Sequence, residues 1–394
     1  MTATVSTATV PGPADADELA ADELTSAEYP EPDGVRYCPR LPVVFDRGRG
    51  AELRSADGRL FVDLFAGGGV LNYGHNNLFI KRRVLDHLSR DEIVPCPGRR
   101  TTAEWDFLHT FQDIVLRPRD LELTVRLSGP TRADAVGAAV ELARAATGRR
   151  RVIALTGADH GIAGDSVALV ERLITADSGG LPAAIVVEPM WVAGNVHQAP
   201  AAWLRAVADR YGVLLVLDES RTGCGRTGTF FRFEQFGVRP DFVVMSMSTG
   251  GYGPPLPMVL CRPDLDLWPG AHDTIGRGPD QLALVAATAA CELWTEPKFL
   301  TDVVVATRRL DRFRTELAGV DHAVAVRGRG MLLAIDLGDA RRANRLRRFA
   351  FDHEVIVGVG GRTDEVVLVT PPLCIDIARL ERGIDVLRRG LPAV

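Results

Sequence analysis

The sequence predicts an α/β fold built around a mainly parallel sheet. Between residues 123 and 263, short apolar runs rich in β-branched residues alternate with amphipathic stretches, a pattern typical of βαβ units. Several of the apolar runs are almost wholly hydrophobic, as expected for strands that are covered on both faces. The predicted strands are 124–127, 152–155, 183–187, 213–217, 242–245 and 258–260.

Apolar residues at helical spacing predict helices between these strands and in much of the chain after them. A helix is predicted at 135–147, because apolar residues recur there at the spacing of one helix face. From residue 281 a helical segment runs to residue 317, and a final helix is predicted at 375–387. Further short runs predict strands of a smaller unit, at 43–45, 60–64, 332–335 and 366–369.

These elements divide the chain into four parts. Residues 1–35 form an acidic tail without Lys or Arg, and this composition predicts disorder. We expect residues 36–75 and 291–394 to build a small α/β domain together, with residues 76–290 as the large domain. The tail lacks the basic and apolar segments of a signal peptide, so we expect a cytoplasmic protein.

Composition argues against several classes of function. The chain has 394 residues, with 46 Lys and Arg against 51 Asp and Glu, so no nucleic-acid partner is expected. No apolar run approaches the roughly 20 residues that cross a bilayer, so no membrane role is expected. The six cysteines have neither CxxC pairs nor metal-ligand spacing, so we expect reduced thiols and no metal site.

The carboxyl ends of the predicted strands indicate where a small-molecule ligand would bind, because open parallel α/β sheets bind ligands at that edge. Function is therefore expected from the residues that follow the strands. The five segments are 128–135, 157–161, 188–195, 218–221 and 246–251.

Several longer strings of residues resemble one enzyme family. They are Phe65–His75, Gly223–Phe231, Arg327–Met331 and Pro371–Leu373, and they match in register from about residue 37 onward. Together they resemble the class III aminotransferases of the fold-type-I pyridoxal phosphate (PLP) superfamily, and within these the diaminobutyrate–2-oxoglutarate aminotransferases. The resemblance implies a fold-type-I aminotransferase-like structure and an obligate homodimer.

The resemblance also implies a lysine that holds PLP as a Schiff base, and here the sequence departs from the family. Met247 stands at the position of this lysine in the string Met245–Gly251, and a thioether cannot form an imine. The chain has only two lysines: Lys81 lies several residues after the glycine-rich string, and Lys298 follows Pro297 in a polar stretch. Neither is expected to replace the missing amine.

Other positions that the resemblance implies in PLP binding differ as well. Arg132 and Ala133 replace the Gly-Ser or Gly-Thr pair that binds the phosphate at a helix end. Asp159 replaces the aromatic residue that stacks on the cofactor ring. Asp218 matches the aspartate that pairs with the pyridinium nitrogen, so it would be the cofactor contact if PLP were retained.

Three residues are candidates for catalysis: Asp218, His160 and Asp159. Asp159 beside His160 could orient or charge an imidazole, which titrates near neutrality and suits acid–base work. Equally, the two side chains could point apart, with His160 simply inherited from the family. Without PLP, Asp218 would be a carboxylate at the base of a cleft, able to act as a base or to anchor a cation.

Five residues are candidates for substrate binding: Arg221, Glu219, Arg132, Trp191 and Met247. Arg132 at a helix start could bind a carboxylate or phosphate, although a surface arginine is the commoner case in so arginine-rich a chain. Arg221 follows a buried strand, which favours pairing with Asp218, Glu219 or an anionic ligand. Trp191 could pack on a ligand or belong to the core or a subunit interface.

The combined loss of the lysine, the phosphate-binding pair and the stacking ring predicts that no cofactor is used. The first hypothesis is a repurposed aminotransferase fold that catalyses a PLP-independent step, such as cyclisation, condensation, dehydration or isomerisation, on a small amino- or carboxylate-bearing metabolite. One alternative is a non-catalytic pseudoenzyme or the partner subunit of an active aminotransferase. Another is a residual ω-aminotransferase of diaminobutyrate type that holds PLP non-covalently.

Overall fold

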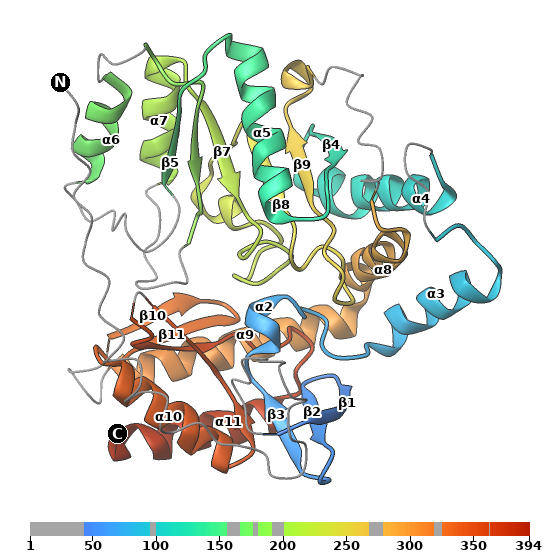
Figure 1. Cartoon of the computed structure of the whole chain (residues 1–394), viewed down its shortest axis with the longest axis vertical. Helices are drawn as coiled ribbons and strands as arrows, with labels where there is room; N and C mark the ends of the chain where they lie inside the picture. Colours follow the sequence, from blue (N-terminus) through green and yellow to red (C-terminus); the bar gives the residue numbers. More distant parts are fainter. Residues whose placement is uncertain are drawn as a thin grey trace, which may run out of the picture.

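The α/β prediction is confirmed, with a large domain that lies above a smaller one in the view of Figure 1. The large domain contains a six-stranded sheet, and the small domain contains two four-stranded sheets. The computed structural model describes residues 43–94, 100–155, 166–175, 180–190, 201–267, 279–318, 325–361 and 363–394.

The six-stranded sheet has the strand order β4-β9-β8-β7-β6-β5. Strands β5 to β8 run parallel, and β9 is antiparallel to both of its neighbours, so the sheet is mainly parallel as predicted. Each predicted strand of this sheet lies within one residue of the observed bounds. The strands are β4 (Thr124–Leu127), β5 (Val152–Leu155), β6 (Ala184–Val187), β7 (Leu214–Asp218), β8 (Phe242–Met245) and β9 (Met258–Cys261).

Helices cover both faces of this sheet, which explains why its strands are hydrophobic throughout. On one face, α5 (Arg132–Thr147) packs against the even-numbered residues of β6, β7 and β8, such as Val216. The odd-numbered residues, such as Leu217, face the other side and join a larger core. That side is covered by α4 (Thr102–Phe111), α6 (Ser166–Thr175), α7 (Ala201–Tyr211) and α8 (Gln281–Glu292).

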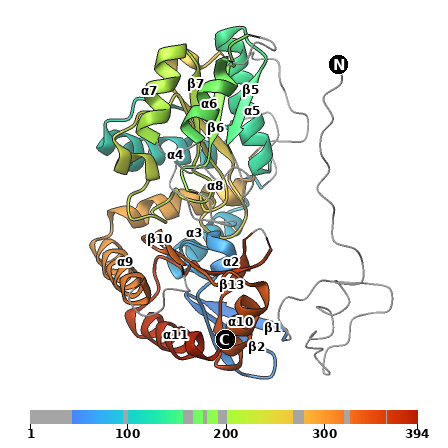
Figure 2. The ribbon, with the colours of Figure 1, turned by 90° about the vertical axis from the view of Figure 1, so that its left-hand side faces the viewer.

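The small domain is built from segments near both ends of the chain. β12 (Val355–Ile356) pairs in parallel with β3 (Leu60–Asp63) and completes the sheet β1-β2-β3-β12. The second sheet has the order β10-β11-β14-β13. Figure 2 shows the blue strands of the first segment beside the red helices of the last. The other elements are β1 (Phe45–Arg49), β2 (Glu52–Ser55), β10 (Ala325–Arg329), β11 (Leu332–Asp336), β13 (Gly358–Gly360), β14 (Val366–Val369), α2 (Ala66–Gly69), α3 (Leu78–Ser89), α9 (Pro297–Ala318), α10 (Ala340–Asp352) and α11 (Ile377–Gly390).

Two differences from the predicted elements have clear physical causes. α5 begins at Arg132 rather than at residue 135, because Thr131 and Asp134 form a capping box. The Asp134 amide donates to Thr131 Oγ1 at 3.2 Å, and the Thr131 amide donates to Asp134 Oδ2 at 3.0 Å. β10 was not predicted because it carries two arginines and a glycine, and it becomes a strand through backbone pairing with β11. The domain boundaries stay predictions, and the tail 1–35 lies outside the described residues.

Candidate functional site

Two carboxylates lie side by side at the carboxyl edge of the large sheet. β6 and β7 are parallel with Val187 opposite Leu217, so Glu188 and Asp218 occupy the next neighbouring positions. Because facing residues of parallel neighbours point to the same side of a sheet, both side chains lie on the face that α5 covers. Both are buried, with 10% of the Glu188 side chain and 1% of the Asp218 side chain exposed.

Arg132 bridges these two carboxylates from the first turn of α5. Its Nε lies 2.8 Å and its Nη2 2.6 Å from Asp218 Oδ2, and Nη2 also contacts Glu188 Oε1. Burial acts to lower the pKa of Arg132, but the two carboxylates more than offset it and raise the pKa above its ordinary value. The arginine therefore supplies the positive charge that two adjacent buried carboxylates require.

Glu219, the residue after Asp218, lies in the loop that follows β7 and has different partners. Glu219 is 1% exposed. Its oxygens accept hydrogen bonds from the Thr222 hydroxyl and, at 2.8 Å, from the Phe233 amide. Burial raises the pKa of Glu219 to about 7. Both carboxylate oxygens of Glu219 therefore already accept hydrogen bonds within the protein. The predicted role of Glu219 in substrate binding stays a prediction.

Ser220 and Arg221 each carry a buried polar atom without a hydrogen-bond partner among the described residues. The Ser220 amide donates to Asp218 Oδ1 at 3.0 Å, whereas its buried hydroxyl has no hydrogen-bond partner within the described ranges. The buried Nε of Arg221 likewise has none there. We expected Arg221 to pair with Asp218, Glu219 or an anionic ligand; Asp218 is instead bound by Arg132 and Glu219 by the loop itself. An anionic ligand remains as the predicted partner of Arg221.

Met247 lies at the same edge, two residues after the end of β8, the strand beside β7. It is partly exposed, whereas its neighbours Ser246 and Ser248 are buried. Ser248 Oγ donates to the carbonyl oxygen of Gly69 at 2.9 Å, which ties this loop to the glycine-rich segment of the small domain. The position that the resemblance implies for the lysine therefore lies at the carboxyl edge of the sheet, and this chain has the thioether of Met247 there.

The described structure thus brings Asp218, Arg132, Arg221 and Met247 to one edge of the sheet, as the strand-end argument predicted. Asp159, His160 and Trp191 lie outside the described residues, so their roles stay predictions. Sequence reasoning did not select Glu188, although it lies in one of the strand-end segments. Aligning the predicted strands 183–187 and 213–217 would have placed it beside Asp218.

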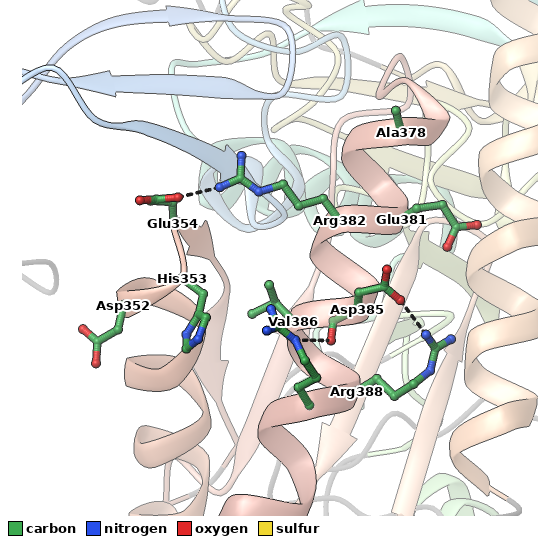
Figure 3. A pocket seen from close by; sticks show the side chains of 10 residues that line it. Asp352, His353, Glu354, Ala378, Glu381, Arg382, Asp385, Val386 and Arg388 are labelled. Carbon is green, nitrogen blue, oxygen red and sulfur yellow. Dashed lines mark hydrogen bonds and ion pairs between the residues drawn. The ribbon is translucent and has the colours of Figure 1, made fainter.

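A separate surface pocket lies in the small domain, between the end of α10 and the side of α11 (Figure 3). Two ion pairs lie among its lining residues: Arg382 pairs with Glu354 at 2.6 Å, and Arg388 pairs with Asp385 at 2.5 Å. Both arginines are therefore already engaged by carboxylates of the same pocket. Among the described residues, no group of three or more His, Cys, Asp or Glu could hold a metal ion. No helix in the same ranges is long and apolar enough to cross a membrane.

In sequence, this chain is similar to known transaminases over nearly its whole length. The family model described as aminotransferase class-III matches residues 166–391. The diaminobutyrate–2-oxoglutarate transaminase of Streptomyces anulatus is 36% identical in an alignment of 407 positions, which covers 93% of this chain and 97% of the relative. The enzyme of the same name from Halomonas elongata is 34% identical over 91% of this chain and 96% of its own length.

In structure, the chain is similar to solved aminotransferases. The N-acetylornithine aminotransferase of Stenotrophomonas maltophilia superposes with a TM-score of 0.75 at 25% identity, over 91% of this chain and 97% of that one. An amine transaminase from an uncultivated Pseudomonas species, solved in its PLP-bound form, has a TM-score of 0.76 at 21% identity, over 94% and 100% of the two chains. These likenesses confirm the fold-type-I aminotransferase-like prediction.

The expectation that no cofactor is used was wrong. The sequence resembles a family whose members hold PLP, and the match to the class III family and to diaminobutyrate transaminases overturns that expectation. Sequence reasoning gave too much weight to three substituted positions and too little to the likeness of the whole chain.

The described residues do not fit PLP in the covalent form that the family resemblance implies. Lys298, with its side chain 85% exposed, pairs with Asp302 at 2.5 Å on α9, and Lys81 lies on α3. At the amino end of α5, the amide and hydroxyl of Thr131 already donate to Asp134. The sheet edge therefore supplies the aspartate for a ring nitrogen but no amine for a Schiff base.

Proposed function

We propose that this protein, which belongs to the class III aminotransferases, binds PLP or its amine form without a covalent bond and acts on an ω-amino acid of diaminobutyrate type. The observation that carries the proposal is the buried carboxylate of Asp218 at the end of β7, in a chain that matches diaminobutyrate transaminases over 93% of its length. These relatives favour the transaminase alternative over the PLP-independent reaction that we first expected from the sequence.

Asp218 and Arg221 have distinct roles in this proposal. Asp218 would pair with the ring nitrogen of the cofactor, which needs a carboxylate in a buried position. Arg221 would bind a carboxylate of the amino acid or the oxo acid, because a guanidinium binds carboxylates through two parallel hydrogen bonds. PLP supplies the electron-accepting ring for this chemistry when it is bound.

The proposal is tested by titrating the protein with PLP while recording absorbance, and by assaying amino transfer from diaminobutyrate to 2-oxoglutarate. We expect saturable binding to the native protein, with no cofactor retained on the chain after borohydride reduction. Met247→Lys restores a nucleophilic amine, so we expect it to retain one cofactor per chain after reduction and to raise turnover by about 100-fold.

Met247→Arg is the matched control, because a guanidinium adds the positive charge but cannot form a stable imine. Its turnover should not rise above the native value. Absence of saturable PLP binding by the native protein would contradict the proposal, whatever the behaviour of the variants.

The assembly that we propose is a homodimer. Apolar side chains on the exposed side of α3 include Leu78, Leu85 and Leu88, which are 49%, 53% and 44% exposed, and Trp105 of α4 is 57% exposed. We propose these side chains as part of the contact surface, because contiguous exposed apolar patches mark interaction sites. Light scattering should give twice the chain mass of 42.6 kDa. The mass of a single chain would contradict the homodimer, and a single chain that pairs only with an active aminotransferase would support the partner-subunit alternative.

A further inference from the structure

Arg132 spans the two points that a bound PLP would have to connect. The resemblance to the family implies that the phosphate lies at the amino end of α5 and that the ring nitrogen contacts Asp218. Arg132 is the first residue of α5, and its guanidinium bonds to Asp218 through Nε at 2.8 Å. The side chain therefore runs from one of these points to the other.

The charges at this edge explain why Arg132 makes this contact. Asp218 and Glu188 are neighbours on adjacent strands and are buried, so removing every cation would leave two like charges in a medium of low dielectric constant. One guanidinium bonded to both carboxylates is the arrangement that avoids this repulsion. A protonated ring nitrogen on Asp218 would bring the same single positive charge to the same place.

We propose that Arg132 is an internal competitor of the cofactor: its guanidinium holds Asp218 and Glu188 until the ring of PLP displaces it. This inference rests on the proposed function, because it concerns the same site. Arg132 is suited to such an exchange, since 30% of its side chain is exposed and its backbone is fixed at the start of α5. After displacement the guanidinium remains attached beside the helix end where the phosphate would lie.

Glu188 determines how firmly the competitor is held. When the guanidinium leaves Asp218, the ring nitrogen replaces it there, but Glu188 keeps its charge and continues to attract Arg132. Replacing Glu188 by Gln removes this second attraction and leaves Asp218 in place. The two acids therefore have opposite effects on PLP affinity: Asp218 favours the cofactor, and Glu188 favours the arginine.

The test is the dissociation constant of PLP, measured by absorbance titration of the full chain and its variants. We expect Arg132→Ala to bind PLP at least about tenfold more tightly than the native protein, because the ring no longer displaces an ion pair. Glu188→Gln should tighten binding several-fold, and Asp218→Asn should weaken it. The matched control is Arg126→Ala on β4, which removes an exposed arginine paired with Asp266 at 2.6 Å and should leave the affinity unchanged.

The possible results separate this inference from the proposed function. If Arg132→Ala binds PLP with native or weaker affinity, the arginine does not compete, and the inference is overturned while non-covalent binding stands. If neither the native protein nor any of these variants binds PLP, the proposed function fails together with the inference. Melting temperatures of all variants identify any change that reflects unfolding, and Glu188→Gln, which conserves size, gives a second independent reading.

Discussion

Two arginines, one buried and one partly exposed, show that a positive charge is held differently in two parts of this protein. Arg226 is 0% exposed, and it donates to the carbonyl oxygens of Met331 at 2.8 Å and Pro371 at 2.6 Å and to the side chain of Asn72. Burial among these neutral acceptors lowers the pKa of Arg226 to about 9. Arg132 lies between two carboxylates, which outweigh the effect of burial and raise its pKa.

The two arginines also differ in how their positions relate to the family that the sequence resembles. Arg226 belongs to the string Gly223–Phe231, which resembles the family, and it joins the large domain to segments near both ends of the chain. The family resemblance implies a small residue of the phosphate site at the position of Arg132. The contacts of Arg226 therefore lie in a string that resembles the family, whereas Arg132 and its two carboxylates lie where the resemblance implies a different residue.

The largest effect on stability is expected from Arg226→Ala. Its loss leaves several buried acceptors without donors, so the free energy of unfolding should fall by about 4 kcal/mol. The measurement is urea unfolding followed by circular dichroism. The control is Arg126→Ala, which removes a partly exposed ion pair and should cost less than about 1 kcal/mol. Equal losses in the two variants would show that Arg226 does not connect the domains as we describe.

A smaller effect, of about 3 kcal/mol, is expected from the titration of Glu219, which lies between Asp218 and Arg226 in the sequence. Burial raises its pKa from 4.5 to about 7, so the folded protein binds this proton more tightly than the unfolded chain. The resulting stabilisation is fully present below pH 4.5 and is lost as the pH rises through 7, by about 1.4 kcal/mol for each pKa unit.

Glu219→Gln should remove this part of the pH dependence, because an amide does not titrate but can serve Thr222 and Phe233 through its nitrogen and oxygen. Thermal unfolding at intervals between pH 4.5 and 7.5 measures the difference, with the exposed Glu122→Gln as the control. If Glu219→Gln and the native protein lose stability in parallel over this range, the buried carboxyl is not the cause.

The sequence alone was sufficient to predict the strands of the large sheet, while the place of a ligand at their carboxyl edge stays a prediction. Strands such as β6 and β8 could be recognised because both of their faces are buried, which makes their hydrophobic runs continuous. Asp218 could be identified because it ends one of those strands. The cofactor could not be judged correctly from Met247 and Arg132 alone, since such local substitutions do not reveal how far the whole chain still matches transaminases.

Other features depend on contacts between residues far apart in the sequence. β12 is only two residues long, and it becomes a strand because Val355 pairs with Val62. The bridge from Arg132 to Glu188 requires both the start of α5 and the register of β6 against β7. For Arg132 we considered a surface position the commoner case. Arg132 is instead bound at the sheet edge, because two buried carboxylates there attract it.

The most direct test of this account is a crystal structure of the native protein grown with PLP. We predict a pyridine ring with its nitrogen on Asp218, no covalent bond to Met247 or to either lysine, and the guanidinium of Arg132 moved away from Asp218. A structure in which Arg132 still binds Asp218 and Glu188, with no ring at the sheet edge at saturating PLP, would contradict the account.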